Sequence, residues 1–315
     1  HLFASFRKAI EAAFDVKYLG PADTYLNLSI SPPGPSSPAV TVHLHHATRD
    51  LLSRAGMSAA NPAPTPMLSS VDPPASTDAS AATAALSDSD TTDYRSWTGA
   101  AMHQVNAARP DASYSVMNLA RSMQSPSHSH MVALKRVLKY FRSASPPSIR
   151  YCLTTISLCG FVDSNWAACP TTRRSVTAYC FFAGGGPVSW CSRLQSTVSL
   201  STAEAEYKAL AEAIKEALFL RSLLRELGFV PDGPTPLYCD STAAIAIASD
   251  PVSHRKVKHV EIQCHFCRDA VLAGQVSLVH IPTEDNVADL FTKPLGPTRF
   301  HLLSSRLYSG TVSPL

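Results

Sequence analysis

The feature that most constrains this chain is a long amphipathic segment, residues 201–227, that carries a carboxylate on its apolar side. Ser201 and Glu204 have the S-x-x-E spacing of a capping box, which predicts that a helix begins there. At about 100° per residue, the apolar residues fall on one stripe that should face a core. Glu206 lies within about 20° of the centre of this stripe. The stripe itself is formed by Ala203, Leu210, Ala213, Ile214, Ala217 and Leu224.

The two carboxylates at the start of this helix have different explanations. Glu204 lies on the opposite face, together with Lys208 and Lys215, and its capping role explains it. Glu206 has no such explanation, because an unpaired carboxylate on a buried face is energetically costly. The helix alone leaves two interpretations open: Glu206 pairs with a base, or it binds a metal ion.

Length and composition indicate a folded chain with room for about two domains. Of its 315 residues, 45% are hydrophobic and 16% are charged, which excludes a wholly disordered protein. The net charge of +3 is by itself a weak argument for nucleic-acid binding. Because the chain starts at His1, we expect it to be a trimmed product or a piece of a longer reading frame.

The apolar runs and the cysteines bear on the cellular location. No apolar run reaches the ~18 residues needed to span a bilayer, and there is no signal-peptide pattern. We therefore expect no membrane partner and no secretion. The eight cysteines are expected to be reduced thiols, in the cytoplasm or the nucleus.

The first 150 residues predict helices that are interrupted by a linker. A helical segment from Phe3 leads into an extended segment that ends at Ile30, and the prolines that follow exclude regular structure. Helical spacing returns over residues 43–56. Proline, alanine, serine, threonine and aspartate dominate residues 61–93, which predicts a flexible linker. Two further helical stretches are predicted within residues 94–150.

After Tyr151 the pattern changes to strands, a long helix, and then strands that alternate with helices. A glycine run at Gly184, Gly185 and Gly186 predicts a hairpin turn between the second and third strands. This order predicts a mixed five-stranded α/β sheet. The predicted strands are residues 156–166, 176–183, 186–192, 236–240 and 275–281. The predicted helices are residues 201–227, 241–249, 259–273 and 286–293.

Four carboxylates fall at the ends or starts of separate predicted elements. Asp163 lies late in the first strand, Asp240 ends the fourth strand, and Asp289 lies in the first turns of the last helix. With Glu206 they are expected to converge at the carboxyl ends of the central strands, where α/β sheets place their sites. Carboxylates this close need cations between them, and oxygen ligands favour Mg²⁺ or Mn²⁺ over zinc. Two such ions about 4 Å apart would act on the attacking and leaving oxygens of a phosphodiester.

Each acid has a structural explanation when it is taken alone. Asp163 and Asp240 are then strand-end residues, and Asp289 complements a helix dipole. The set of four, in the order first strand, long helix, fourth strand and last helix, favours the metal site.

Several strings of residues carry a family resemblance. GFVDSNWAACPTTRRS, PVSWCSRLQSTVSLSTAEAEYKAL, YCDSTAAIAIASDPVSHRKVKHVEIQCHF and NVADLFTKPL resemble the ribonuclease H domain of copia-type LTR retrotransposon polyproteins. This resemblance runs from about residue 158 to residue 303. Upstream, AFDVKYLGPADTYLNLSIS resembles the stretch after the polymerase palm. RDLLSRAGMSAANPAPTP and ARPDASYSVMNLARSMQSPSHSHMVALKRVLKYF resemble the thumb and connection region of the same polyprotein.

The resemblance implies a fold and a domain order. It implies a ribonuclease H-like α/β domain with a mixed five-stranded sheet flanked by helices, preceded by a partial, mostly helical reverse-transcriptase thumb and connection region. Residues 1–60 would be the reverse-transcriptase C-terminal remnant, residues 61–93 the linker, residues 94–150 the helical connection region and residues 151–309 the ribonuclease H-like domain. No paired-aspartate palm motif precedes Tyr151, so we expect no polymerase activity from this fragment.

The resemblance also implies an activity. It places the metal-binding and catalytic acids at Asp163, Glu206, Asp240 and Asp289, and the helical stripe selects Glu206 independently. The implied reaction is endonucleolytic hydrolysis of the RNA strand of RNA–DNA hybrids with two Mg²⁺ ions, or Mn²⁺. The implied partners are the hybrid and the upstream polymerase segment of the same polyprotein, in a cytoplasmic virus-like particle or in the nucleus.

Some positions depart from the family pattern, which leaves a second function open. Asn165 stands where an acid is common, Ala178 where glycine is usual, Val257 where threonine is usual and Gln263 where aspartate is common. His280 does not replace the flexible-loop histidine of cellular ribonucleases H. These departures suggest a divergent copy, and the alternative function is a catalytically inactive relic that binds nucleic acid.

Two groups of basic residues are candidates for nucleic-acid binding. Arg173 and Arg174 follow the first strand, and Arg255, Lys256 and Lys258 precede a helix. We expect them to contact phosphates of the hybrid, because the backbone charge dominates affinity. The alternative is ordinary solvated charge.

Other features are given structural interpretations. Trp166 and Trp190 are predicted to be core residues rather than base-stacking platforms. Cys264 and Cys267 form a single C-x-x-C, which is a weak indication of a zinc-dependent interaction module. The histidines at positions 43, 45 and 46 lack carboxylate or cysteine ligands at suitable spacing and are interpreted as solvated.

Overall fold

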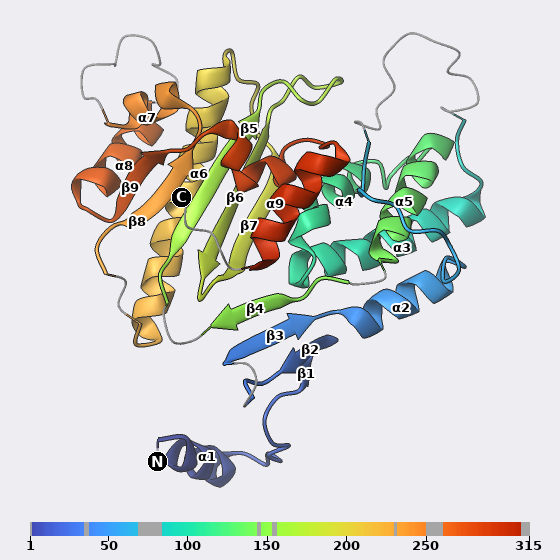
Figure 1. The fold of residues 1–315 in the computed structure, drawn as a ribbon, viewed down its shortest axis with the longest axis horizontal. Coiled ribbons are helices and arrows are strands. Elements are labelled where there is room, and N and C mark those ends of the chain that lie inside the picture. The colour runs from blue at the N-terminus through green and yellow to red at the C-terminus, as the bar shows by residue number, and fades with distance from the viewer. Residues whose placement is uncertain are drawn as a thin grey trace.

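A small antiparallel sheet, a group of helices and a larger mixed sheet follow one another along the chain (Figure 1). The computed structural model describes residues 2–34, 38–68, 84–143, 146–152, 156–229, 232–249 and 261–309. No helix in these ranges is both long enough and apolar enough to cross a membrane.

The N-terminal part contains more strands than its sequence pattern indicates. Helix α1 (Leu2–Ala13) precedes strands β1 (Thr24–Tyr25), β2 (Leu28–Ser31) and β3 (Ala39–His43), and helix α2 (His45–Arg54) follows. These strands and β4 (Ile149–Cys152) form an antiparallel sheet in the order β1-β2-β3-β4. The pairing of β3 with β4 joins residues more than a hundred positions apart, which no local pattern predicts.

Four helical elements follow: α3 (Asp88–Ala107), the short 3₁₀ turn η1 (Pro110–Ala112), α4 (Ser113–Ala120) and α5 (His128–Phe141). The predicted end of the linker at residue 93 is wrong, because α3 begins at Asp88. The Ser87 hydroxyl caps this helix by accepting a hydrogen bond from the Asp90 backbone N–H at 3.1 Å. A serine- and aspartate-rich composition suits both a linker and a capped helix start, so composition alone could not separate the two.

The start of the predicted linker is also packed against the fold. Thr65 and Met67 are buried, and Arg136 on α5 donates to the Thr65 hydroxyl at 2.9 Å. Residues 69–83 lie outside the described part of the chain.

The mixed sheet contains β5 (Cys159–Asn165), β6 (Val176–Ala183), β7 (Gly186–Leu194), β8 (Thr235–Cys239) and β9 (Val276–His280). Its order is β7-β6-β5-β8-β9, with β5–β6 and β6–β7 antiparallel and β5–β8 and β8–β9 parallel. Gly184 and Gly185 adopt positive φ at the β6–β7 hairpin, as the glycine run predicted. The five strands and their flanking helices confirm the predicted ribonuclease H-like α/β fold class.

Three helices cover one face of this sheet: α6 (Thr202–Glu226), α7 (Thr242–Ser249) and α8 (Glu261–Leu272). Helix α6 begins at the predicted cap, where the Ser201 hydroxyl accepts from the Glu204 backbone N–H at 3.1 Å. Leu210 and Ile214 of the predicted stripe are fully buried against sheet residues such as Val162. The stripe therefore faces the core, and it carries Glu206 into the protein with it.

The other face of the sheet shares its core with the preceding helices (Figure 1). Tyr94 and Leu134 from the helical region belong to the same buried cluster as Cys180 on β6 and Leu303 on helix α9 (Pro297–Ser309). The Trp190 indole N–H also donates to the Val105 carbonyl at 2.8 Å. The domain boundary at residue 151 stays a prediction, but it runs through a continuous core.

The C-terminal elements differ from the predicted single helix over residues 286–293. The short 3₁₀ turn η5 (Val287–Phe291) replaces it, after a preceding 3₁₀ turn η4 (Thr283–Asp285), and α9 then follows. Helix α9 was missed, although Phe300, Leu303 and Leu307 have the spacing of a buried helical face.

A buried ion pair joins α9 to the helical region. The Arg109 guanidinium donates to both carboxylate oxygens of Asp111 at 3.0 Å. The Tyr140 and Tyr308 hydroxyls donate to the same carboxylate, Tyr308 at 2.7 Å. Burial alone would raise the pKa of Asp111, but Arg109 and the two phenols hold that pKa below its ordinary value. This ion pair, which lies far from the sheet's acids in sequence, was not found by sequence reasoning.

Candidate metal and nucleic-acid site

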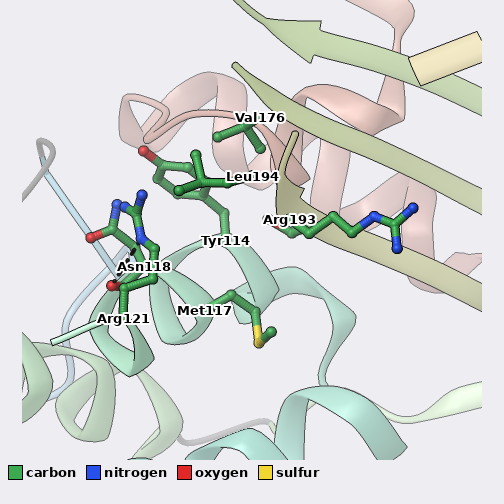
Figure 2. A pocket seen from close by; sticks show the side chains of 8 residues that line it. Tyr114, Met117, Asn118, Arg121, Val176, Arg193 and Leu194 are labelled. Atoms are coloured by element: carbon green, nitrogen blue, oxygen red, sulfur yellow. Dashed lines mark hydrogen bonds between the residues drawn. The ribbon is translucent and has the colours of Figure 1, made fainter. Parts of the chain in front are cut away.

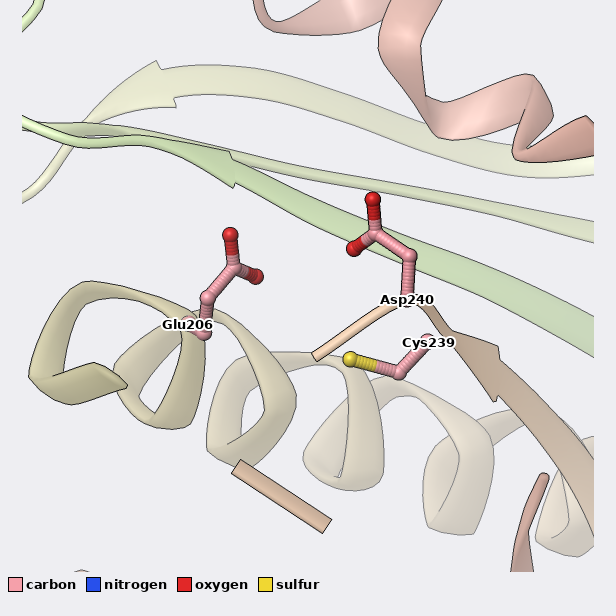
Figure 3. Close-up of side chains that lie close together, drawn as sticks. All are labelled: Glu206, Cys239 and Asp240. Carbon is pink, nitrogen blue, oxygen red and sulfur yellow. The ribbon is translucent and has the colours of Figure 1, made fainter. Parts of the chain in front are cut away.

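Glu206 and Asp240 point toward each other at the end of β8 (Figure 3). One carboxylate oxygen from each, together with the Cys239 sulfur, lie within 4.8 Å of one another. In the described part of the chain, this is the one group of three acid, cysteine or histidine ligands with metal-compatible spacing. The long helix and the fourth strand of the sheet thus bring together two of the four acids proposed from the sequence.

Glu206 is a buried carboxylate with an unsatisfied oxygen. The residue is 5% exposed, and none of the described residues donates a hydrogen bond to its Oε2 atom. The pKa of Glu206 is raised to about 8, mainly by burial and in addition by the charge of Asp240. The polar groups of Ser164 oppose this shift to a smaller extent. Such a carboxylate needs a proton or a cation at this oxygen.

Asp163 lies in the same electrostatic environment at the end of β5. It is 3% exposed, and its Oδ2 atom accepts a hydrogen bond from the Thr292 hydroxyl at 2.5 Å. Burial raises the pKa of Asp163 well above its ordinary value, and the charges of Glu206 and Asp289 raise it further. The charge of Asp163 therefore interacts with that of Glu206 and with that of Asp289.

Asp289 is held differently, because two cations engage it. The residue is fully buried in η5, Lys293 Nζ lies 2.6 Å from its Oδ1 atom, and Arg299 Nη2 donates to Oδ2. The same Lys293 Nζ lies 3.9 Å from Asp163 Oδ2. Although burial opposes the shift, Asp163 and Asp289 raise the pKa of Lys293. An ammonium group thus stands between two of the four acids.

Lys293 and Arg299 are functional candidates that sequence reasoning missed. Lys293 follows Asp289 at the i,i+4 spacing of a helical ion pair, which could have indicated the contact. Arg299 gives no such local indication, because it comes from the next helix.

Asp240 is the most accessible of the four acids. It is partly exposed at the end of β8, and the Thr283 hydroxyl donates to its Oδ2 atom at 2.7 Å. Its position beside the buried Glu206 leaves this edge of the cluster accessible to solvent.

The donor chemistry of the cluster fits a hard divalent cation. Glu206, Asp240 and Asp163 offer carboxylate oxygens, which Mg²⁺ and Mn²⁺ prefer. Cys239 does not fit as a ligand for such an ion, because a sulfur donor suits soft metals rather than Mg²⁺ or Mn²⁺. Its sulfur accepts the Ser241 backbone N–H at 3.4 Å instead.

The predicted basic residues are only partly described. Arg173 and Arg174 are exposed in the loop between β5 and β6, where Arg173 adopts a positive φ of 56°. Arg255, Lys256 and Lys258 lie outside the described residues, as does Val257. Of the five basic residues predicted to bind nucleic acid, the structure therefore locates Arg173 and Arg174.

The alternative metal sites receive no support from the described residues. Cys267 is buried in the core against α6, while the side chain of Cys264 lies outside the described part. His43 and His45 stack at 3.8 Å between ring centroids and line a cavity of about 1050 Å³. Within the described ranges, neither Cys267 nor these histidines belong to a metal-compatible cluster.

A separate cavity of about 260 Å³ lies between α4 and strands β6 and β7 (Figure 2). Its lining includes Tyr114, Met117 and Leu194 but no carboxylate. Arg193 lines it only in part, because its guanidinium binds Glu212 at 2.5 Å. We therefore assign this cavity no part in the chemistry of the four acids.

The prediction that both tryptophans are core residues is wrong for Trp166. Its side chain is 44% exposed just past the end of β5, whereas Trp190 is half-buried. The strand ends at Asn165, one residue before its predicted end, so Trp166 lies outside the sheet.

Comparison with known proteins places the chain in a family. No protein-family model matches it. It is 36% identical over 268 residues to the retrovirus-related Pol polyprotein from transposon RE1 of Arabidopsis thaliana, a match over 84% of this chain. It is 31% identical over 306 residues to that from transposon TNT 1-94 of Nicotiana tabacum, a match over 96% of this chain. The chain belongs to the retrovirus-related Pol polyproteins of transposons.

This Pol segment spans about a fifth of its relatives, 18% of the RE1 protein and 22% of the TNT 1-94 protein. Among solved structures, it resembles the LC11 ribonuclease H1 in complex with an RNA/DNA hybrid, at 16% identity and a TM-score of 0.33. That match covers 43% of this chain and 94% of the other. The strand order of the mixed sheet, rather than this superposition, defines the fold. A copia-type origin within the family stays a prediction.

Proposed function

We propose that this Pol segment is a metal-dependent ribonuclease H, which hydrolyses the RNA strand of RNA–DNA hybrids endonucleolytically. The observation that carries the proposal is the buried Glu206 carboxylate, which faces Asp240 with one oxygen unsatisfied. Retaining a pair of this kind is costly unless a cation binds it. Membership in the Pol family supports a nucleic-acid substrate rather than another phosphodiester.

Four acids would hold two Mg²⁺ ions, or Mn²⁺, in this proposal: Asp163, Glu206, Asp240 and Asp289. Two divalent ions bound there supply positive charge that stabilises the attacking and leaving oxygens of a phosphodiester. Lys293 supports this assignment, because its ammonium already lies between Asp163 and Asp289. For Asp289 to act as a ligand, Lys293 and Arg299 must release one of its oxygens.

The surrounding side chains orient the acids. Thr292 fixes one oxygen of Asp163, and Thr283 fixes one oxygen of Asp240, so each carboxylate keeps its second oxygen free to turn toward the cluster. Hydrogen bonds of this kind hold metal ligands in position and tune their affinity. The Asn165 amide donates to the Thr292 carbonyl at 3.3 Å, a bond that an acid at this position could not make when ionised.

The substrate and the partners form the outer part of the proposal. Arg173 and Arg174 would contact backbone phosphates of the hybrid beside the acids. Arg255, Lys256 and Lys258 are assigned the same role from the sequence alone. The hybrid would come from the polymerase segment of the same polyprotein, in a cytoplasmic virus-like particle or in the nucleus.

The test is cleavage of a labelled hybrid in Mg²⁺ by the parent chain and two variants. Asp240→Asn keeps the side-chain shape but removes the charge that retains the cation. We expect cleavage to fall about 100-fold or more, since even outer-shell partners of a metal change activity about 10- to 100-fold. Hybrid binding and the fold should change little, because binding rests mainly on the basic residues.

Glu204→Gln is the matched control on the same helix. Glu204 binds the Leu200 backbone N–H at 2.9 Å and Lys208 at 2.7 Å, on the face away from the cluster. Its amide variant should cut at nearly the parent rate. If Asp240→Asn also cuts at the parent rate, the four-acid site is wrong.

The ion pairs of Asp289 favour a second function, which is nucleic-acid binding without cleavage. Both of its oxygens are already engaged by cationic side chains, as expected if the segment binds nucleic acid without cutting it. Hybrid binding by the parent chain with no Mg²⁺- or Mn²⁺-dependent cleavage would select this relic function.

A further inference from the structure

Trp166 exposes an aromatic surface whose polar atom is already satisfied. Its indole N–H donates to the Ser199 carbonyl at 2.9 Å, in the segment that joins β7 to α6. The side chain is nevertheless 44% exposed. The surface that it offers to solvent is therefore purely apolar, and the hydrogen bond fixes its orientation.

Two further apolar side chains lie beside it. Val198 and Leu200, which flank the residue bonded to Trp166, are 47% and 75% exposed. We call Trp166, Val198 and Leu200 the apolar platform. Exposed side chains of this kind are common when they are scattered singly, but three together on adjacent segments form a patch.

Buried hydrogen bonds hold the platform rigidly from behind. The Ser199 hydroxyl donates to Gln195 Oε1 at 2.7 Å, and Gln195 Nε2 donates to the Ala205 carbonyl on α6 at 2.8 Å. Ser199 and Gln195 are both buried. The apolar platform is thus anchored to the same helix that carries Glu206, and little side-chain entropy remains to be lost when it binds a ligand.

The apolar platform lies next to the four acids. Trp166 directly follows Asn165, the last residue of β5, whose amide donates to the Thr292 carbonyl at 3.3 Å, and the Thr292 hydroxyl in turn donates to Asp163. Trp166 lies three residues after Asp163, which is at most about 11 Å along the chain. The exposed Arg173 and Arg174 follow in the next loop.

We propose that the apolar platform contacts the strand that is cut, within about three nucleotides of the scissile phosphate. This inference rests on the proposed function, because it takes the hybrid as the ligand. A nucleic-acid strand advances about 3.4 Å per nucleotide, so the distance of at most about 11 Å from Asp163 spans about three nucleotides. RNA-containing helices present a wide and shallow minor groove, where an apolar surface reaches sugars and base edges without unpairing them.

Size and charge favour a nucleic acid over a protein at the apolar platform. Three side chains are far less than the 20 to 30 residues that each partner contributes to a stable protein interface. The neighbouring arginines would attract a polyanion. A contact of this kind tolerates any sequence and adds affinity without adding charge.

The test compares hybrid binding by the parent chain and its variants in metal-free buffer, by fluorescence anisotropy over a range of salt. Trp166→Ala should weaken binding about tenfold, the loss expected for one aromatic–nucleotide contact. The slope of log Kd against log salt should not change, because no phosphate contact is lost. Arg174→Ala should instead make the slope shallower. Phe219→Ala, at an exposed aromatic further along α6, is the matched control and should bind as the parent does.

Tryptophan fluorescence gives a second measurement. The hybrid should quench the emission of the parent chain, and Trp166→Phe should lose most of this quenching, because the other tryptophans are only partly exposed. Unchanged Kd and unchanged quenching in the Trp166 variants would overturn the platform and leave the proposed function standing. A parent chain that binds no hybrid would overturn both. A Trp166 variant that loses self-association in sedimentation but keeps its affinity would show that a second copy covers the platform.

Discussion

Two groups of buried charge in the described part of the chain are stabilised in different ways. At Asp111, one guanidinium and two phenols satisfy both carboxylate oxygens, so the charge is neutralised in place. At the sheet edge, several carboxylates gather, the pKa of Glu206 rises to about 8, and one oxygen has no donor among the described residues. A satisfied buried charge joins structural elements, whereas an unsatisfied one marks a position where a ligand can bind.

The largest expected difference in stability comes from removing the satisfied carboxylate. Asp111→Ala leaves the buried Arg109 guanidinium without its partner, and breaking a buried pair in this way costs about 3–5 kcal/mol. We expect the midpoint of urea unfolding to fall accordingly. Hybrid binding at temperatures where the variant is folded should persist. A loss of unfolding free energy below about 1 kcal/mol would show that the Asp111 group is not stabilised by its ion pair, and the contrast with the acids at the sheet edge would fail.

The two groups should also respond to pH in opposite directions. The pKa of Glu206 is raised in the folded state, so the unfolded chain releases this proton first as pH rises. The metal-free protein should therefore lose stability, by a few kcal/mol at most, between about pH 4.5 and pH 8. Asp111 has a lowered pKa, so its contribution is present above the ordinary pKa of 3.8 and is lost as pH falls below it.

Adding Mg²⁺ and replacing Glu206 distinguish the pH dependence caused by the acids at the sheet edge from that caused by Asp111. Millimolar Mg²⁺ should remove the loss of stability between pH 4.5 and pH 8, and Glu206→Gln should reduce it without metal, because Asp163 also has a raised pKa in the folded state. The measurement is thermal unfolding across this range with and without Mg²⁺. A metal-free stability that is flat over this range would contradict the assignment of an uncompensated carboxylate.

The smallest effect is expected for Tyr308→Phe. This change removes one of the donors to Asp111 and keeps the ring, so it should cost about 1–2 kcal/mol. Chemical unfolding of the variant beside Tyr25→Phe, an exposed tyrosine, is the check. Equal stability of the two variants would mean that Arg109 and Tyr140 suffice to stabilise the buried Asp111 carboxylate.

The sequence predicted the parts of this molecule that depend on local periodicity. The stripe on α6 identified Glu206 as the buried carboxylate, and the change of pattern after Tyr151 located the five strands of the mixed sheet. Contacts between distant segments could not be predicted in this way. Tyr308 reaches Asp111 across nearly two hundred residues, and Arg299 reaches Asp289 from the next helix. The exposure of Trp166 was also missed, because it depends on where β5 ends.

Helix α9 touches both charge groups at once. Near its start, Arg299 binds Asp289, and near its end Tyr308 binds Asp111, about 13 Å further along at 1.5 Å per residue. A helix over this length behaves as a stiff rod, so an axial shift at one end appears at the other. Loosening the Asp111 contact would therefore change how firmly Asp289 is held. We therefore expect the fit between the helical region and α9 to influence how readily Asp289 can exchange Arg299 for another cation.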